Sequence, residues 1–332
     1  MNTQAWKNQM KTMPSTYKVI KELGLSKNLE ELNSFGITVI PPDQIGDPNL
    51  LEQCREAILR IAYERTGVKH DLKKGTHGTL DNSATSMHQY LLLAILEEDV
   101  VFEKIIQHPI TLALVEHYLG TTCLLSSLDA FIKWQDPEPD EQNLGLHSDD
   151  HLYQGLYLPD PSQCFNTNWI LTDYTKDNGA FCVVPGSHKF RRRPKPGEGV
   201  EDAVPVEATA GSILAFNGNV WHGAFPRKND GLRLSLSVFY GAFHYRVQEN
   251  FQGRISDEMI ARNGERFRKL LNLEDVWAYK DSRGAIPWRE RSTTKNWSDL
   301  FKEPVTINGQ QYRIVNDISN NDHMYIDYVP LK

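Results

Sequence analysis

The sequence lacks long apolar runs, paired cysteines and an excess of basic charge. No window of its 332 residues approaches the roughly 20 apolar residues that a membrane-spanning helix requires, and the polar stretch from Met1 to Met13 has no apolar core of a secretory signal. The four cysteines show neither CxxC spacing nor the density of a disulfide framework, which is typical of a reducing, intracellular setting. We therefore expect a cytoplasmic protein with no membrane partner.

The charge balance is mildly acidic and argues against a nucleic-acid partner. The formal net charge is −7 and the pI about 5.9, so a broad basic surface is not expected. The longest basic run, Arg191 to Lys195, lies among prolines; we interpret it as a solvated loop, with a contact to an anionic substrate as the alternative. With 40% hydrophobic residues, the chain has enough apolar side chains for one large core plus additions.

The first third of the chain has mainly helical patterns. Residues 1–34 predict a short helical extension, and residues 35–41 a strand that ends at two prolines. Apolar residues at helical spacing predict a helix over 49–64, whereas 69–86 is rich in Gly, Thr and Lys and predicts a mobile loop. The apolar run that begins at residue 90 predicts helix from 88 to 119.

After Gly120 the pattern changes to short strands separated by turn residues. This pattern extends to about Tyr245 and is typical of an all-β sandwich or barrel. A helix is predicted after it, over 251–277. Near the end, Asn308-Gly309 between alternating residues predicts a hairpin. We expect a mainly β protein with flanking helices around a double-stranded β-helix (jelly-roll, cupin-like) core. Its expected parts are an N-terminal extension (1–34), a jelly-roll domain (35–285) and a C-terminal extension with the hairpin (286–332).

Two histidines and an aspartate are the candidate metal ligands. His147 and Asp149 are two residues apart, so their side chains leave the same face if the segment is a β-strand. His222 follows an apolar strand and a glycine-containing turn, which places it at the mouth of the predicted barrel. Two histidines and one carboxylate form the facial triad that leaves coordination positions open on Fe(II). The His-x-Asp pair alone is weak evidence, and the downstream histidine strengthens it.

An arginine eleven positions after His222 is the candidate anchor for a carboxylate. In the strand that contains it, Arg233, Ser235 and Ser237 share one face, while leucines and a valine share the other. A guanidinium that faces into a barrel requires a partner, and a ligand carboxylate would supply one through a bidentate bond. Ser235 either supports Arg233 or bonds to the backbone.

Taken together, these residues resemble the phytanoyl-CoA dioxygenase family of Fe(II)/2-oxoglutarate enzymes. The resemblance rests on His147-x-Asp149, on His222 and on Arg233 at the family's offset from that histidine. Further matching segments, in order, are 168–179, 184–189 and 245–250, so that the resemblance covers roughly residues 33 to 275.

The resemblance implies a role for each candidate residue. His147, Asp149 and His222 would bind Fe(II), and Arg233 would pair with the distal carboxylate of 2-oxoglutarate. Lys133 stands where the family places a polar co-substrate contact. Iron halogenases of this group have a small residue at the position of Asp149, so the carboxylate favours hydroxylation or another oxidation.

The implied activity is a 2-oxoglutarate-dependent dioxygenase reaction. It would use O₂ as second co-substrate, hydroxylate an unactivated C–H of a small-molecule or natural-product substrate, and produce succinate and CO₂. Desaturation, cyclisation and epoxidation remain open outcomes. The alternatives are an acyl-CoA 2-hydroxylase, a non-catalytic jelly-roll binding protein and a Zn(II) hydrolase. The C-terminal hairpin is a candidate lid or homodimer contact, to which the resemblance does not extend.

Overall fold

The computed structural model describes residues 16–77, 85–86, 88–150, 157–273, 305–307, 310–317 and 325–330. By internal contacts the chain divides into two units, Met1–Leu273 and Glu274–Lys332. The expected three-part division stays a prediction. Among the described residues, no helix is both long and apolar enough to cross a membrane.

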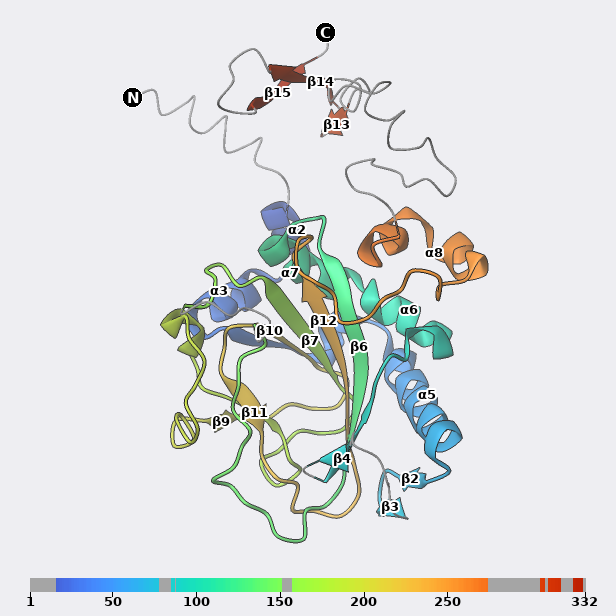
Figure 1. Cartoon of the computed structure of the whole chain (residues 1–332), viewed down its shortest axis with the longest axis vertical. Helices are drawn as coiled ribbons and strands as arrows, with labels where there is room; N and C mark the ends of the chain where they lie inside the picture. The colour runs from blue at the N-terminus through green and yellow to red at the C-terminus, as the bar shows by residue number, and fades with distance from the viewer. Residues whose placement is uncertain are drawn as a thin grey trace. The chain divides into compact units, whose positions relative to one another are not determined.

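A seven-stranded antiparallel sheet forms the frame of the first unit (Figure 1). Its strands, in spatial order, are β1 (Ile37–Ile40), β10 (Ile213–Asn217), β7 (Cys164–Ile170), β12 (Arg233–Gly241), β6 (Leu124–Lys133), β5 (Gln89–Leu92) and β4 (Thr85–Ser86). The four central strands β10, β7, β12 and β6 come from distant parts of the sequence. Side chains from residues 124 to 241 are therefore brought onto one surface.

Helices cover one face of this sheet. They are α2 (Thr16–Glu22), α3 (Ser26–Phe35), α4 (Pro42–Ile45), α5 (Pro48–Thr66), α6 (Val100–Ile106), α7 (Pro109–Leu119) and α8 (Asp257–Leu270), with the short 3₁₀ turns η1 (Leu96–Glu98) and η2 (Ser187–Phe190) elsewhere. Leu234, Leu236 and Val238 of β12 are buried in one core together with apolar side chains of α5, α6 and α7. Because side chains alternate along a strand, Arg233, Ser235 and Ser237 face the other side, as the alternation predicts.

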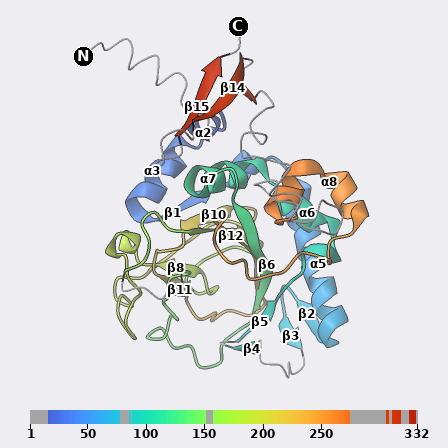
Figure 2. The same ribbon diagram turned by 45° about the horizontal axis from the view of Figure 1, so that its top comes forward.

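A three-stranded sheet lies opposite that other face. It consists of β11 (His222–Ala224), β8 (Phe181–Val183) and β9 (Val204–Pro205). Figure 2 shows β8 and β11 on one side of β6, with α5 and α6 on the other. Residues of both sheets line a common cavity. The two facing antiparallel sheets make up the predicted jelly-roll core, which is confirmed.

Local sequence explains the limits of the longest helix, α5. The Asp47 side chain accepts a hydrogen bond from the Asn49 N–H at 3.0 Å, which caps the N-terminus. Gly67 ends the helix in the left-handed conformation (φ 69°), and its N–H donates to the Tyr63 carbonyl. The helix predicted over 49–64 is thus confirmed.

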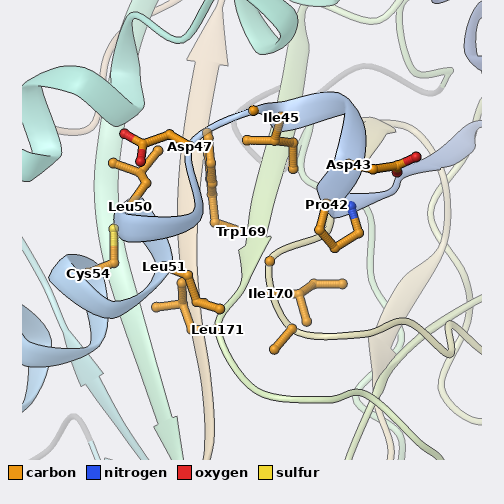
Figure 3. Close-up of a pocket in the computed structure, with 13 residues that line it drawn as sticks. Pro42, Asp43, Ile45, Asp47, Leu50, Leu51, Cys54, Trp169, Ile170 and Leu171 are labelled. Carbon is orange, nitrogen blue, oxygen red and sulfur yellow. The ribbon is translucent and has the colours of Figure 1, made fainter.

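A pocket of about 420 Å³ lies on the helix-covered side of the sheet (Figure 3). Ile45 and Leu50 border it from the α4–α5 segment, and Trp169 and Leu171 border it from the end of β7. Trp169 belongs to the helix-side core, and its neighbour Asn168 lines the cavity between the two sheets. The sheet therefore separates the two hollows.

Two local predictions are wrong. Helix was predicted throughout 88–119, but Gln89–Leu92 forms β5, which pairs with β6, and helix begins only at Val100. A loop was predicted over 69–86, but β2 (Lys69–Asp71) and β3 (Gly75–His77) form a hairpin. A short apolar run is compatible with either a strand or a helix, and here pairing with β6 decides in favour of the strand.

The second unit contains a three-stranded antiparallel sheet. Its strands are β13 (Val305–Ile307), β14 (Gln310–Asp317) and β15 (Tyr325–Pro330). Val305 pairs with Tyr312 and Ile307 with Gln310, so the predicted hairpin is confirmed, although its Asn308-Gly309 turn lies outside the described residues. Its role as a lid or dimer contact stays a prediction.

Candidate active site

The three candidate metal ligands converge on one point. One ligand atom from each of His147, Asp149 and His222 lies within 4.8 Å of the others. The Nε2 atoms of the two histidines lie 3.6 Å and 3.5 Å from the same carboxylate oxygen, Asp149 Oδ1. Within the described part of the chain, no other group of three His, Cys, Asp or Glu side chains has such a geometry.

Backbone carbonyls select the tautomer of both histidines. His147 Nδ1 lies 2.8 Å from the Gly145 carbonyl, and His222 Nδ1 lies 3.0 Å from the Val220 carbonyl. Because a carbonyl can only accept a hydrogen bond, each Nδ1 carries the proton. Nε2 of each ring then faces the point that both share with Asp149, so Nε2 is the atom that could bind a metal ion there.

The segment around His147 is not the strand that the spacing argument assumed. His147 and His222 exchange a pair of backbone hydrogen bonds, 2.9 Å each, as an isolated bridge. The Asp149 N–H donates to the Gly218 carbonyl at 2.8 Å. Gly223 is required at this point, since a Cβ there would lie 2.1 Å from the Leu144 carbonyl oxygen. The ligands therefore meet through backbone pairing between two distant segments.

The surroundings of the triad favour a bound cation. Phe181 stacks on the buried His222 ring with 5.1 Å between centroids. Burial lowers the pKa of His222, but the negative charge of Asp149 outweighs it, so the net pKa is raised. Asn166 Nδ2 donates to Asp149 Oδ2 at 2.5 Å, which leaves Oδ1 to face the two histidines. Two imidazoles and one oriented carboxylate fit a divalent metal ion, which would replace the proton that Asp149 favours on His222.

Two buried cations lie in the same cavity. Arg233 at the start of β12 pairs in register with Lys133 at the end of β6, and these side chains are only 4% and 2% exposed. Burial, followed by repulsion from Arg233, lowers the pKa of Lys133 to about 7. Among the described residues, no carboxylate comes within 4.0 Å of either cationic group. Arg233 Nε has no partner, and one Nη donates to the Gly179 carbonyl at 3.4 Å.

The cavity that joins these groups has a volume of about 410 Å³. Its lining contains all six predicted side chains, namely His147, Asp149, His222, Arg233, Lys133 and Ser235. The three converging ligand candidates and two buried basic side chains, which have no close ion pair in the described part of the chain, thus share one hollow between the two sheets. The chemistry of these donors fits a metal ion chelated by an anionic ligand whose far end reaches the cations. The individual roles of the residues stay predictions.

Sequence reasoning missed several polar residues of this cavity, among them Asn166, Asn168 and Asp129. Asn166 and Asn168 point inward from β7, and their buried side-chain oxygens have no partner. Asp129 points inward from β6. Polar residues at alternate positions of otherwise apolar strands could have indicated all three, because such alternation marks a polar interior face.

An open triad of two histidines and a carboxylate inside a jelly roll defines a class, the mononuclear non-haem iron oxygenases. The sequence profile of the phytanoyl-CoA dioxygenase family matches residues 33–235. The chain belongs to this family and is a non-haem iron, 2-oxoglutarate-dependent dioxygenase.

Relatives are named dioxygenases. Dioxygenase af480 of Aspergillus fumigatus is 30% identical over 185 residues, which cover 54% of this chain and 57% of that protein. Dioxygenase cdmA of Talaromyces verruculosus is 27% identical over 257 residues, which cover 73% of this chain and 82% of that protein.

Solved structures support the fold. HygX from Streptomyces hygroscopicus, with nickel and 2-oxoglutarate bound, has a TM-score of 0.51 at 16% identity and covers 70% of this chain and 93% of its own. The carbocyclase SnoK from nogalamycin biosynthesis, described as non-heme and alpha-ketoglutarate dependent, has a TM-score of 0.50 at 21% identity. It covers 70% of this chain and 90% of its own.

Proposed function

We propose that the chain hydroxylates an unactivated C–H of a small-molecule or natural-product substrate. His147, Asp149 and His222 hold Fe(II), and Arg233 binds the distal carboxylate of 2-oxoglutarate. Bound iron, 2-oxoglutarate and O₂ supply the oxidising chemistry, with succinate and CO₂ as co-products. The observation that carries this proposal is the pair of buried cations, Lys133 and Arg233, in the same cavity as the triad.

The protein's own side chains have defined tasks in this proposal. Asn166 orients the Asp149 carboxylate through its 2.5 Å hydrogen bond. Phe181 stacks on the His222 ring and would keep water from that side of a bound metal. Ser235 lines the same cavity and contacts the co-substrate in this proposal.

The alternatives fit the cavity less well. For an acyl-CoA substrate, the basic run 191–195 would have to bind phosphates. Instead, Arg192 forms two bonds to Glu198, of 2.8 Å and 2.6 Å, and Arg193 donates to the Asp150 carbonyl. A non-catalytic binding protein or a Zn(II) hydrolase gives no reason for two unneutralised cations beside the triad. Cyclisation remains the second outcome, because the carbocyclase SnoK shares the fold.

Anaerobic addition of Fe(II) and 2-oxoglutarate should produce a weak visible charge-transfer band. We expect the band in the wild-type protein and its loss in His147→Ala, because that variant lacks one of the three ligands. Absorption spectroscopy under argon is the measurement. A wild-type protein that gives no band, and no succinate under O₂ with any candidate substrate, would exclude the dioxygenase reaction.

The affinity for 2-oxoglutarate should fall as the pH rises above 7. The free enzyme holds Lys133 with a pKa of about 7, so this side chain is cationic below that pH and neutral above it. If one proton is linked to binding, the dissociation constant rises by up to about tenfold per pH unit. Calorimetric titration of Ni(II)-loaded protein with 2-oxoglutarate at several pH values measures this dissociation constant. Lys133→Met should bind more weakly at low pH and show a flatter profile; an unchanged profile would exclude Lys133 from the co-substrate site.

A further inference from the structure

The cavity contains a second carboxylate at a distance from the two cations. Asp129 lies on the same face of β6 as Lys133 but four residues away, roughly 13 Å along the strand. Across the sheet it pairs in register with Ser237 of β12. In the described lining of the cavity, Asp129 and the triad member Asp149 are the only acidic side chains.

No basic side chain neutralises Asp129 in the described part of the chain. Its carboxylate accepts hydrogen bonds from the Ala94 N–H, at 3.3 Å, and from Ser127. Burial raises the pKa of Asp129, and neither Lys133 nor any other cation contributes to the shift. Glu249 lies close enough that Asp129 contributes to its raised pKa. In the described lining this end of the cavity is therefore acidic, whereas the other end holds Lys133 and Arg233; Glu249 lies outside the lining and pairs with Arg254 at 3.2 Å.

Apolar side chains line the cavity on the strands next to the carboxylate. Phe131 is the next inward residue on β6, and Phe239 is the next inward residue after Ser237 on β12. Leu91 of β5 pairs in register with Phe131 and also lines the cavity. A carboxylate beside aromatic rings suits an alkylammonium group, which gains both a charge-assisted hydrogen bond and cation–π attraction.

We propose that Asp129 binds a basic nitrogen of the substrate, so that the enzyme acts on apolar amines. This inference rests on the proposed function, because it assigns the substrate class of the same cavity. Phe131 and Phe239 hold the apolar body, and the nitrogen at Asp129 fixes which carbon faces the triad. A neutral hydroxyl would leave the carboxylate's charge uncompensated on closure of the cavity, whereas an ammonium compensates it.

Matched probe pairs test this assignment. Protein loaded with Ni(II) and 2-oxoglutarate does not turn over. It is titrated with 4-phenylbutylamine and with 4-phenylbutan-1-ol, and then with one amine–alcohol pair of shorter chain and one of longer chain. We expect the wild type to bind the amine of the best-fitting pair about ten- to a hundredfold tighter than the alcohol. The isosteric variant Asp129→Asn should lose this preference. The control Asp43→Asn removes a carboxylate on the other side of the sheet and should keep it.

The remaining outcomes of these titrations would contradict the proposal. Equal affinity within every wild-type pair, binding of neither member of any pair, or an amine preference that survives in Asp129→Asn would overturn the role of Asp129. The charge-transfer band separates this failure from failure of the proposed function. A wild type with the band but without the amine preference rejects only the substrate class. Retention of the band in Asp129→Asn shows that the variant is folded and binds its co-substrate.

Discussion

Replacement of His222 by alanine should abolish iron binding and, with it, turnover. The ring is buried, and its Nε2 lies 3.5 Å from Asp149 Oδ1 on the side where the His147 ring converges. The variant leaves His147 and Asp149 as the two remaining ligands of the described site. Loss of residues that only support metal ligands costs about 10- to 100-fold in metal affinity, so loss of a ligand should exceed 100-fold. Iron content after dialysis against limiting Fe(II) measures the effect.

His188→Ala is the matched control for this experiment. His188, in η2, is a half-buried histidine that lies outside the group of three converging ligands. Its ring packs against Gly36, where a Cβ would lie 2.6 Å from Nδ1. The variant should therefore keep its iron even if its melting temperature falls. Retention of iron by His222→Ala, or equal loss in both variants, would contradict the assignment of His222 as a ligand.

The features that were predictable from the sequence are those with a local signal. The β12 strand alternates leucine with polar residues, so the inward direction of Arg233 and Ser235 follows from period two alone. The spacing of His147 and Asp149 predicted that the two side chains converge, and they do, but not because they lie on one regular strand. Their convergence depends on the bridge to His222 and on the hydrogen bond from Asp149 N–H to Gly218. Such pairing between distant segments cannot be predicted from a short window of sequence, because it has no local sequence pattern.

Other features depend on tertiary context. The run from Tyr90 to Leu96 is apolar on every side, so it has no periodicity that would distinguish strand from helix. Positive φ angles at His88 and Ala94, of 55° and 53°, interrupt the chain on both sides of β5. The role of Asp129 could not be predicted from the sequence either, because a single aspartate in a strand forms no distinctive pattern. It becomes informative only when the fold places it in a cavity beside aromatic residues and at a distance from Lys133 and Arg233.

Arg233→Met should weaken 2-oxoglutarate binding strongly while iron binding is maintained. The guanidinium is buried, lies over the Tyr174 ring at 5.4 Å and has an Nε without a partner. A charge-assisted hydrogen bond contributes about 1.5–3 kcal/mol, so loss of a bidentate pair should reduce affinity at least about tenfold and up to several hundredfold. The band titration gives the 2-oxoglutarate affinity, and dialysis gives the iron content.

Arg227 shows what a structural arginine looks like in this fold. Its guanidinium donates to the carbonyls of Gly231, Asn178 and Asp230, so its donors are used within the protein. Arg233 has one long bond, to Gly179 at 3.4 Å. Its remaining donors are therefore available to a ligand, which is why we assign it to the co-substrate.

A graded series then tests whether geometry or charge matters at this position. Arg233→Lys keeps the charge but loses the planar fork, so its 2-oxoglutarate affinity should lie between those of the wild type and Arg233→Met. Arg55→Met removes a charge from α5, where Arg55 bonds the Leu171 carbonyl, and should leave the affinity unchanged. If Arg233→Met lost iron and 2-oxoglutarate in equal measure, Arg233 would have a structural role. If Arg233→Lys matched the wild type, the bidentate bond would be excluded.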